Sequence, residues 1–402
     1  MLLYRARNGF RSRLPVAMIQ HLHISGFKCF RDLQLPQLGQ INLFVGKNNT
    51  GKSSVLEAVE LFVSDSPESL LRACARRTTE SADFRYPRPY DSRPYDSEEI
   101  ARLVTLLVSQ FHREQGEIKI SQIEIRSDEP KGTLKIDSRG LPIEIIDHEL
   151  RLMNREKGRR LRLGREAEMF ADSFTVIRGS AEFRRSLLEY LAFGKGIREL
   201  DKGGEQSPGA HPQSARVAFL SARGFTQRDG KRLWDQVSIA GRDEAVLEWM
   251  RLIEPEIKDL RYIGDENQRE DRPHLRINGD MGFTPMASLG DGLTRIFHIA
   301  LAMASVDGGV LLIDEFENGL HWSVQKELWR VIGEAAQKFS VQVFATTHSR
   351  DCMQALVSAQ NDRLIKNLVY VYRMERDGEN ILPYNMPLKA LESALDLDVE
   401  VR

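Results

Sequence analysis

The sequence predicts an α/β fold with an inserted region of strands and helices. Three observations support this prediction. An apolar segment at 41–45 leads through a glycine-rich loop into an amphipathic segment at 53–62, as a strand, a loop and a helix would. Residues 310–313 are all apolar, as expected for a strand that is buried on both faces. From residue 260 onward, strand-like and helix-like segments alternate, which is typical of a parallel α/β arrangement.

The composition is that of an ordinary globular protein. The chain has 402 residues, of which 41% are hydrophobic and 29% charged, and its formal net charge is −1. A balanced charge gives no support for nucleic-acid or membrane binding by the chain as a whole, so such partners must be argued from local patches. The three widely spaced cysteines form no metal-ligand pattern and indicate reduced thiols in the cytoplasm. No apolar stretch is long enough to span a bilayer, so we expect no membrane partner.

The chain divides into four predicted parts. The extension at 1–17 has four arginines and is either a basic arm or a mis-assigned start. We favour a mis-assigned start, because a first strand already begins near Met18. In the inserted part, alternating residues predict strands at 118–125 and 133–136, and apolar spacing predicts a helix at 183–191. The parts are an extension at 1–17, an N-terminal lobe at 18–64, an inserted region at 65–215 and a C-terminal lobe at 216–402.

The glycine-rich loop matches G-x-x-x-x-G-K-[ST], the Walker A pattern of phosphate-binding loops. In such a loop, backbone N–H groups cradle the phosphates, the ammonium of Lys52 reaches the β- and γ-phosphates, and the hydroxyl of Ser53 ligates Mg²⁺. We therefore predict ATP and Mg²⁺ as cofactors. The residues expected to contact the nucleotide here are Gly46, Asn48, Asn49, Thr50, Gly51, Lys52, Ser53 and Ser54.

Two acids follow the apolar strand at 310–313, as in a Walker B strand. Asp314 is predicted to hold Mg²⁺, and Glu315 to orient or deprotonate the attacking water. The alternative is a core strand followed by two solvated acids, but the Walker A loop upstream favours the catalytic interpretation. His348 follows a second predicted strand at 341–345, where it can sense the γ-phosphate, although a single histidine there is more often a simple loop residue.

Five motifs in this order resemble those of ABC-type ATPases of the SMC, RecF and OLD class. The resemblance implies the ABC-ATPase head, a P-loop NTPase fold with a mixed sheet; it covers residues 18–62 and 284–352, and the segment between them matches only in length. Besides Walker A, four segments carry it. Ile24–Phe30 is similar to the family's NF[RK]xF start, and Ser288–Leu293 is similar to the OLD-type signature. Asp314–His321 is similar to Walker B and its continuation, and Thr346–Ser349 is similar to the family's TTHS.

The resemblance implies an ATP site shared between two chains. Walker A and Walker B of one subunit would need the signature loop of another to close over ATP, so the working unit would be a homodimer or a higher homo-oligomer. The catalytic residues carried over are Lys52, Glu315 and His348. The signature residues expected to reach the partner's nucleotide are Leu289, Gly290 and Gly292.

The signature departs from the transporter-type LSGGQ sequence. Gly290 stands where that sequence has its serine, so a backbone N–H or Ser288 would have to substitute for the hydroxyl. Asp291 brings a negative charge near the expected phosphates, and we expect it to face away or to pair with an arginine. His321 replaces the family's aspartate in the following loop, and Gln122 is the best candidate for a Q-loop glutamine.

The expected partners follow from what the resemblance includes. OLD nucleases carry a C-terminal Toprim domain, and only 54 residues follow His348, so we expect a separately encoded effector rather than an intrinsic nuclease. The segment Arg151–Arg165 has seven basic residues and one acid, and it is equally consistent with DNA or RNA binding and with a solvated face.

These features bear on three possible functions. The leading one is an ATPase coupled to nucleic acid or an effector in phage defence or DNA repair. The alternative is an ATP-bound sensor or assembly platform with little turnover. A transporter ATPase is disfavoured because LSGGQ is absent and because a long segment separates Lys52 from Asp314.

Overall fold

The computed structural model describes residues 18–63, 110–114, 117–118, 122–128, 131–138, 174–178, 184–186, 217–264, 271–279, 282–306, 308–360, 365 and 368–401. The N-terminal extension, the Arg151–Arg165 segment and most of the inserted region lie outside these residues, so the predictions made for them stay predictions.

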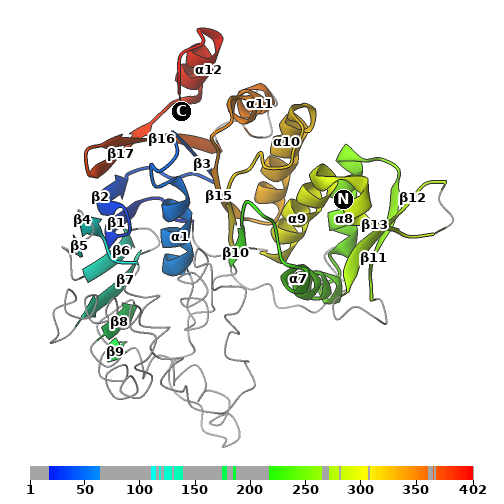
Figure 1. Cartoon of the computed structure of the whole chain (residues 1–402), viewed down its shortest axis with the longest axis horizontal. Helices are drawn as coiled ribbons and strands as arrows, with labels where there is room; N and C mark the ends of the chain where they lie inside the picture. Colours follow the sequence, from blue (N-terminus) through cyan, green and yellow to red (C-terminus); the bar gives the residue numbers. More distant parts are fainter. Residues whose placement is uncertain are drawn as a thin grey trace, which may run out of the picture.

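A six-stranded mixed sheet forms the centre of the described structure (Figure 1). Five strands run parallel, and the last pairs antiparallel with its neighbour. In spatial order the strands are β10 (Val217–Leu220), β14 (Val310–Ile313), β15 (Gln342–Thr346), β3 (Ile41–Val45), β16 (Val369–Asp377) and β17 (Asn380–Asn385). Strands β3, β14 and β15 are buried along their whole length, as their largely apolar sequences predicted.

A second sheet of six strands is entirely antiparallel. Its spatial order is β2 (Phe30–Leu35), β1 (Leu22–Phe27), β6 (Gln122–Asp128), β7 (Lys131–Ser138), β8 (Phe174–Arg178) and β9 (Arg184–Ser186), with a separate small pair of β4 (Arg113–Glu114) and β5 (Glu117–Ile118). Strands β6 and β7 agree with the meander predicted from alternation. The helix predicted at 183–191 is wrong where the structure describes it, because Arg184–Ser186 pairs with β8 as a strand.

Helix α1 (Lys52–Val63) lies between the two sheets (Figure 1). It contacts β14 and β15 on one side and β6 and β7 on the other, and one hydrophobic core joins it to both sheets. Even Glu57 and Glu60 of this helix are only 2% and 3% exposed, and Glu57 forms an ion pair with Lys28 at 2.6 Å. The phosphate-binding loop is therefore followed by a helix that is buried on almost every side.

A second core joins the opposite face of the mixed sheet to helices that pack on it or on one another (Figure 1). These helices are α7 (Gln227–Ile239), α8 (Asp243–Ile253), α9 (Asp291–Ser305), α10 (Trp322–Lys338), α11 (Arg350–Gln360) and α12 (Leu388–Asp396). A three-stranded sheet of β11 (Ile257–Ile263), β12 (Arg272–Ile277) and β13 (Thr284–Pro285) leads into the 3-10 turn η3 (Met286–Leu289), just before α9. Within the described segments, no helix is long and apolar enough to cross a bilayer.

Candidate nucleotide-binding site

The predicted site residues meet at the carboxyl ends of three neighbouring parallel strands. Strand β3 leads into the phosphate-binding loop, β14 ends before Asp314, and β15 ends before Thr347 and His348. Because β15 lies between β3 and β14, the loops that follow these strands open at the same edge of the sheet. This edge is where ligands bind in open α/β sheets.

The two fixed glycines of the loop are required by space and by backbone conformation. Gly46 has a φ of 141°, and a Cβ there would lie 2.4 Å from the carbonyl oxygen of Met374. Gly51 has a φ of 82°, and a Cβ there would lie 2.7 Å from both Cys29 Sγ and the Phe30 ring. The loop is thus held between the β1–β2 hairpin and strand β16, with no room for a side chain at either contact.

Lys52 lies across the loop and donates hydrogen bonds to its carbonyl groups. Its Nζ is 2.7 Å from the carbonyl oxygens of both Gly46 and Lys47, and Thr50 Oγ1 donates to the Lys47 carbonyl at 2.8 Å. Burial lowers the pKa of Lys52, although the carboxylates of Asp314, Glu317 and Glu315 act in the opposite direction. Lys52, the first residue of α1, thus places a positive charge at the loop.

The two residues predicted to hold Mg²⁺ are in direct contact. Ser53 Oγ donates to Asp314 Oδ1 at 2.7 Å, and Thr346 Oγ1 donates to the same oxygen at 2.7 Å. A serine hydroxyl and a single carboxylate supply the hard oxygen ligands that Mg²⁺ prefers when phosphates and water complete its coordination. The residues present therefore fit a magnesium ion bound together with a nucleotide.

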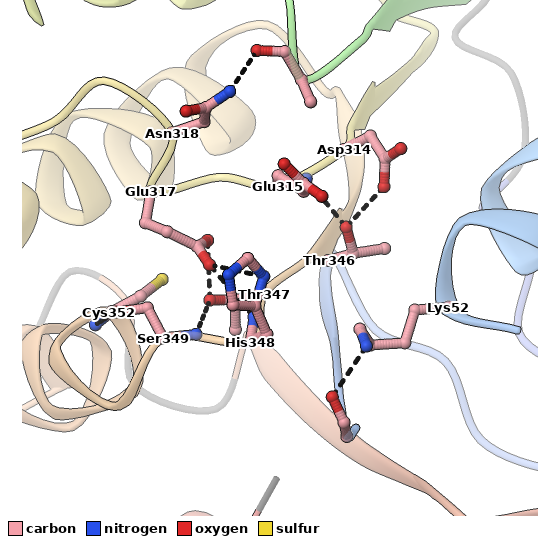
Figure 2. A network of polar contacts seen from close by, with 12 residues as sticks. Lys52, Asp314, Glu315, Glu317, Asn318, Thr346, Thr347, His348, Ser349 and Cys352 are labelled. Atoms are coloured by element: carbon pink, nitrogen blue, oxygen red, sulfur yellow. Dashed lines mark hydrogen bonds and ion pairs between the residues drawn. The ribbon is translucent and has the colours of Figure 1, made fainter. Parts of the chain in front are cut away.

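Glu315 has a left-handed backbone, which is uncommon for a residue with a side chain. Its φ is 49°, and its N–H donates to Thr346 Oγ1 at 2.9 Å (Figure 2). Its carbonyl accepts from Arg295 Nη2 at 2.9 Å. A residue in this conformation persists only when its surroundings enforce it, and such residues concentrate at functional sites. Here the surrounding hydrogen bonds fix the strand end that carries the predicted catalytic carboxylate.

Arg295 is a site residue that the sequence did not reveal. It is 4% exposed, and besides Glu315 it donates to the carbonyl oxygens of Asp314 at 2.8 Å and Ser221 at 2.6 Å. Burial lowers its pKa to about 10, and the carboxylates of Asp314, Glu317 and Glu315 oppose that shift. An arginine in the middle of an apolar helix gives no local signal of such a role, because its acceptors come from distant segments.

Glu317 was noted only as part of the resemblance, yet it organises the region around His348. Its Oε2 accepts from Thr347 Oγ1 at 2.7 Å, and its Oε1 accepts from the His348 backbone N–H at 3.1 Å and lies 3.2 Å from His348 Nδ1. Figure 2 shows these three side chains pointing toward one another beside the ends of β14 and β15. Half of the His348 side chain is exposed, so its ring is held on one side and open on the other.

Among the described residues, the signature loop makes no contact with the phosphate-binding loop of its own chain and lies instead beside the loop that follows β14. A Cβ built on Gly319 would be 3.7 Å from Asp291 Cβ, and Gly292 lies against the Gly319 carbonyl. Gly290 is exposed, with a φ of 105° and open space around its Cβ position, whereas Leu289 is half-buried. The loop is therefore accessible from outside the chain.

The remaining residues noted in the sequence have ordinary local roles. Asp291 is exposed in the first turn of α9, where the helix dipole favours an acid, and it forms no ion pair with a described residue. His321 caps α10 by accepting from the Ser323 N–H, and the Gln122 amide donates to Glu124 within β6. Ser54 is buried on α1, away from the exposed tip of the loop at Asn48 and Asn49.

This chain is similar in sequence to several known proteins. An ATP/GTP phosphatase of Helicobacter pylori is 21% identical over 377 residues, which cover 91% of this chain and 95% of that protein. An OLD nuclease of Thermus scotoductus is 21% identical over 351 residues, which cover 83% of this chain and 59% of the nuclease. An uncharacterized protein of Methanocaldococcus jannaschii is 55% identical over 47 residues, 12% of this chain and 22% of that protein.

Solved structures of SMC heads are also similar to this chain. The SMC head bound to the C-terminal winged-helix domain of ScpA is 13% identical and has a TM-score of 0.49, covering 93% of this chain and 99% of that structure. The SMC head of Thermotoga maritima is 13% identical with a TM-score of 0.45.

A family model described as "AAA domain, putative AbiEii toxin, Type IV TA system" matches residues 41–351. This match is well over half of the chain, and it includes the glycine-rich loop, the acids that follow β14 and the histidine that follows β15. The chain therefore belongs to this AAA-domain family of ATPases.

Proposed function

We propose that the chain hydrolyses ATP, closes into a homodimer around it, and couples this cycle to nucleic acid or to an effector protein. The observation that carries the proposal is the shared oxygen of Asp314, which accepts from Ser53 of the phosphate-binding loop and from Thr346 of β15. This contact joins the expected phosphate site, metal site and catalytic strand end. A loop that only bound a nucleotide would not need the acids and the histidine at the same place.

Each residue in the site has a chemical role in this proposal. Mg²⁺, held by Ser53 and Asp314, would neutralise charge on the β- and γ-phosphates. Lys52 has its ammonium at the loop and would leave the Gly46 and Lys47 carbonyls for phosphate oxygens. Glu315 would orient the attacking water, and His348 would hydrogen-bond to the γ-phosphate through the side of its ring that faces away from Glu317.

The dimer follows from the position of the signature loop. Gly290 and Asp291 are exposed beside Gly319, and Trp322 is 65% exposed at the start of α10. An indole with that exposure, three residues after Gly319 in the chain, is what a surface that becomes buried would present. We infer that the second copy places its nucleotide against this surface.

A defence role is the best-supported biological setting. The family description names a toxin of a toxin–antitoxin system, and one similar protein is named as a nuclease. The alternative function is a platform that binds ATP, turns over slowly and scaffolds a separate effector. Asp291 favours this alternative, because its exposed carboxylate lies in the loop that would approach the partner's phosphates.

The test compares the wild-type chain with Glu315→Gln, which keeps the side-chain size and removes the carboxylate. ATP turnover and oligomeric state are measured with no nucleotide, with ATP and with ADP, and turnover is repeated with double-stranded DNA and with RNA. We expect turnover only in the wild type and an ATP-dependent dimer that persists in the variant. Absence of turnover together with absence of the trapped dimer contradicts the proposal, and a dimer without turnover in the wild type supports the platform.

A further inference from the structure

Strand β16, more than 300 residues after the phosphate-binding loop, contacts the loop at two points. At the first, the carbonyl oxygen of Met374 closes the space beside Gly46. At the second, the guanidinium of Arg376 donates to the backbone carbonyl of Asn49 from Nε at 3.2 Å and from Nη2 at 2.9 Å. Asn49 is the residue at the tip of the loop that has a left-handed backbone, with a φ of 63°.

We propose that Arg376 is a positioning residue for nucleotide binding, which orients the peptide between Asn49 and Thr50. The C=O and N–H of a trans peptide point in opposite directions because the unit is planar. With the Asn49 carbonyl held by Arg376, the N–H of Thr50 must point to the opposite side. This inference rests on the proposed binding of nucleotide phosphates by the backbone N–H groups of the loop.

Orientation at this peptide matters because the local backbone is uncommon. A left-handed asparagine is tolerated but not strongly favoured, so the loop tip has competing conformations in which the peptide is rotated. The other end of the loop is fixed by Lys52 and Thr50 on the Lys47 carbonyl, and those bonds do not reach Asn49. Among the described residues, Arg376 is the side chain that fixes this carbonyl.

The expected consequence concerns affinity rather than chemistry. Without Arg376, a nucleotide would have to select the competent loop from several conformations, and apparent affinity falls by the fraction that is competent. For the loss of a charge-assisted hydrogen bond at an exposed site, we expect binding to weaken about five- to twentyfold. Turnover at saturating ATP should stay within about twofold, because the bound nucleotide restores the loop.

The experiment measures the Kd of ADP by titration calorimetry, since ADP binding needs neither hydrolysis nor a dimer. The variants are Arg376→Met, which keeps the aliphatic part, and Arg376→Lys, which keeps the charge but not the paired N–H donors. The control is Arg276→Met, an exposed arginine on strand β12 that pairs with Asp259. Melting temperatures establish that each variant is folded.

We expect Arg376→Met to weaken ADP binding, Arg376→Lys to recover only part of it, and the Arg276 control to match the wild type. Wild-type affinity in Arg376→Met overturns the proposal. Full recovery by Arg376→Lys also overturns it, because a positive charge alone would then suffice. A wild-type chain that binds ADP but does not hydrolyse ATP contradicts the proposed hydrolysis and leaves this inference standing, whereas one that does not bind ADP contradicts both.

Discussion

Replacing Arg295 with methionine should cost much of the stability of the chain. The guanidinium donates to three backbone carbonyls from two segments, those of Ser221, Asp314 and Glu315, and it is almost completely buried. Methionine fills a similar volume and offers no donor. The three carbonyls would then be buried without their partner, beside carboxylates whose charge Arg295 now balances.

The magnitude follows from these contacts. Hydrogen bonds from a charged group contribute about 1.5–3 kcal/mol each, and the cost of burying the guanidinium cancels part of their sum. The Nε atom has no hydrogen-bond partner among the described residues, which reduces the sum further. Removing one member of a buried charged network typically costs about 3–5 kcal/mol, and we expect Arg295→Met to lie in that range.

The assay is urea denaturation at pH 7, with Arg330→Met as the matched control. Arg330 is also a helical arginine, but it is partly exposed and pairs with Glu327 and Glu334 of its own helix, so its loss should cost less than about 1 kcal/mol. A loss of under about 1 kcal/mol for Arg295→Met as well would refute the reasoning that Arg295 fixes the end of β14.

Three further predictions rest on single residues. Gly46→Ala should abolish measurable ADP binding, because its Cβ would overlap the Met374 carbonyl, and titration calorimetry checks this. Glu317→Gln should lower kcat about ten- to a hundredfold with unchanged ADP affinity, because His348 loses its charged partner. Steady-state kinetics and ADP titration check this. An unchanged kcat with weaker ADP binding would mean that Glu317 serves only to build the loop. Burial lowers the pKa of His298 to about 4, so the unfolded chain binds a proton first as pH falls. The free energy of unfolding should therefore be highest above about pH 6.5 and fall by about 2 kcal/mol between pH 7 and 5. His298→Gln should remove this loss, as measured by urea denaturation at both pH values.

The parts of the site that follow strands were predictable from the sequence. Gly46, Lys52 and Ser53 are fixed by short spacing within one loop, and Asp314 follows a continuous apolar run, so local pattern and the rule for parallel sheets place them at one edge. The same local logic identified strands β3, β14 and β15 of the mixed sheet.

The parts that depend on contacts between distant segments were not predictable. Arg295 and Arg376 act on backbone carbonyls, and a carbonyl has no sequence identity that a pattern can reveal. The helix predicted at 183–191 was wrong because apolar spacing over nine residues does not register the hydrogen bonds of a neighbouring strand, which here is β8. Burial of Glu57 and Glu60 likewise depends on contacts of α1 with the second sheet, which the sequence of α1 does not predict.

Because Glu315 has a left-handed backbone, the requirements of stability and of catalysis oppose each other at this position. Glycine adopts that conformation without the penalty of about 1–2 kcal/mol that a side chain incurs, so Glu315→Gly should relieve local strain at the end of β14. The same exchange removes the carboxylate proposed to orient water. A laboratory selection of this chain for heat resistance alone would consequently enrich inactive proteins, and stabilised variants should be sequenced at this codon before their activity is interpreted.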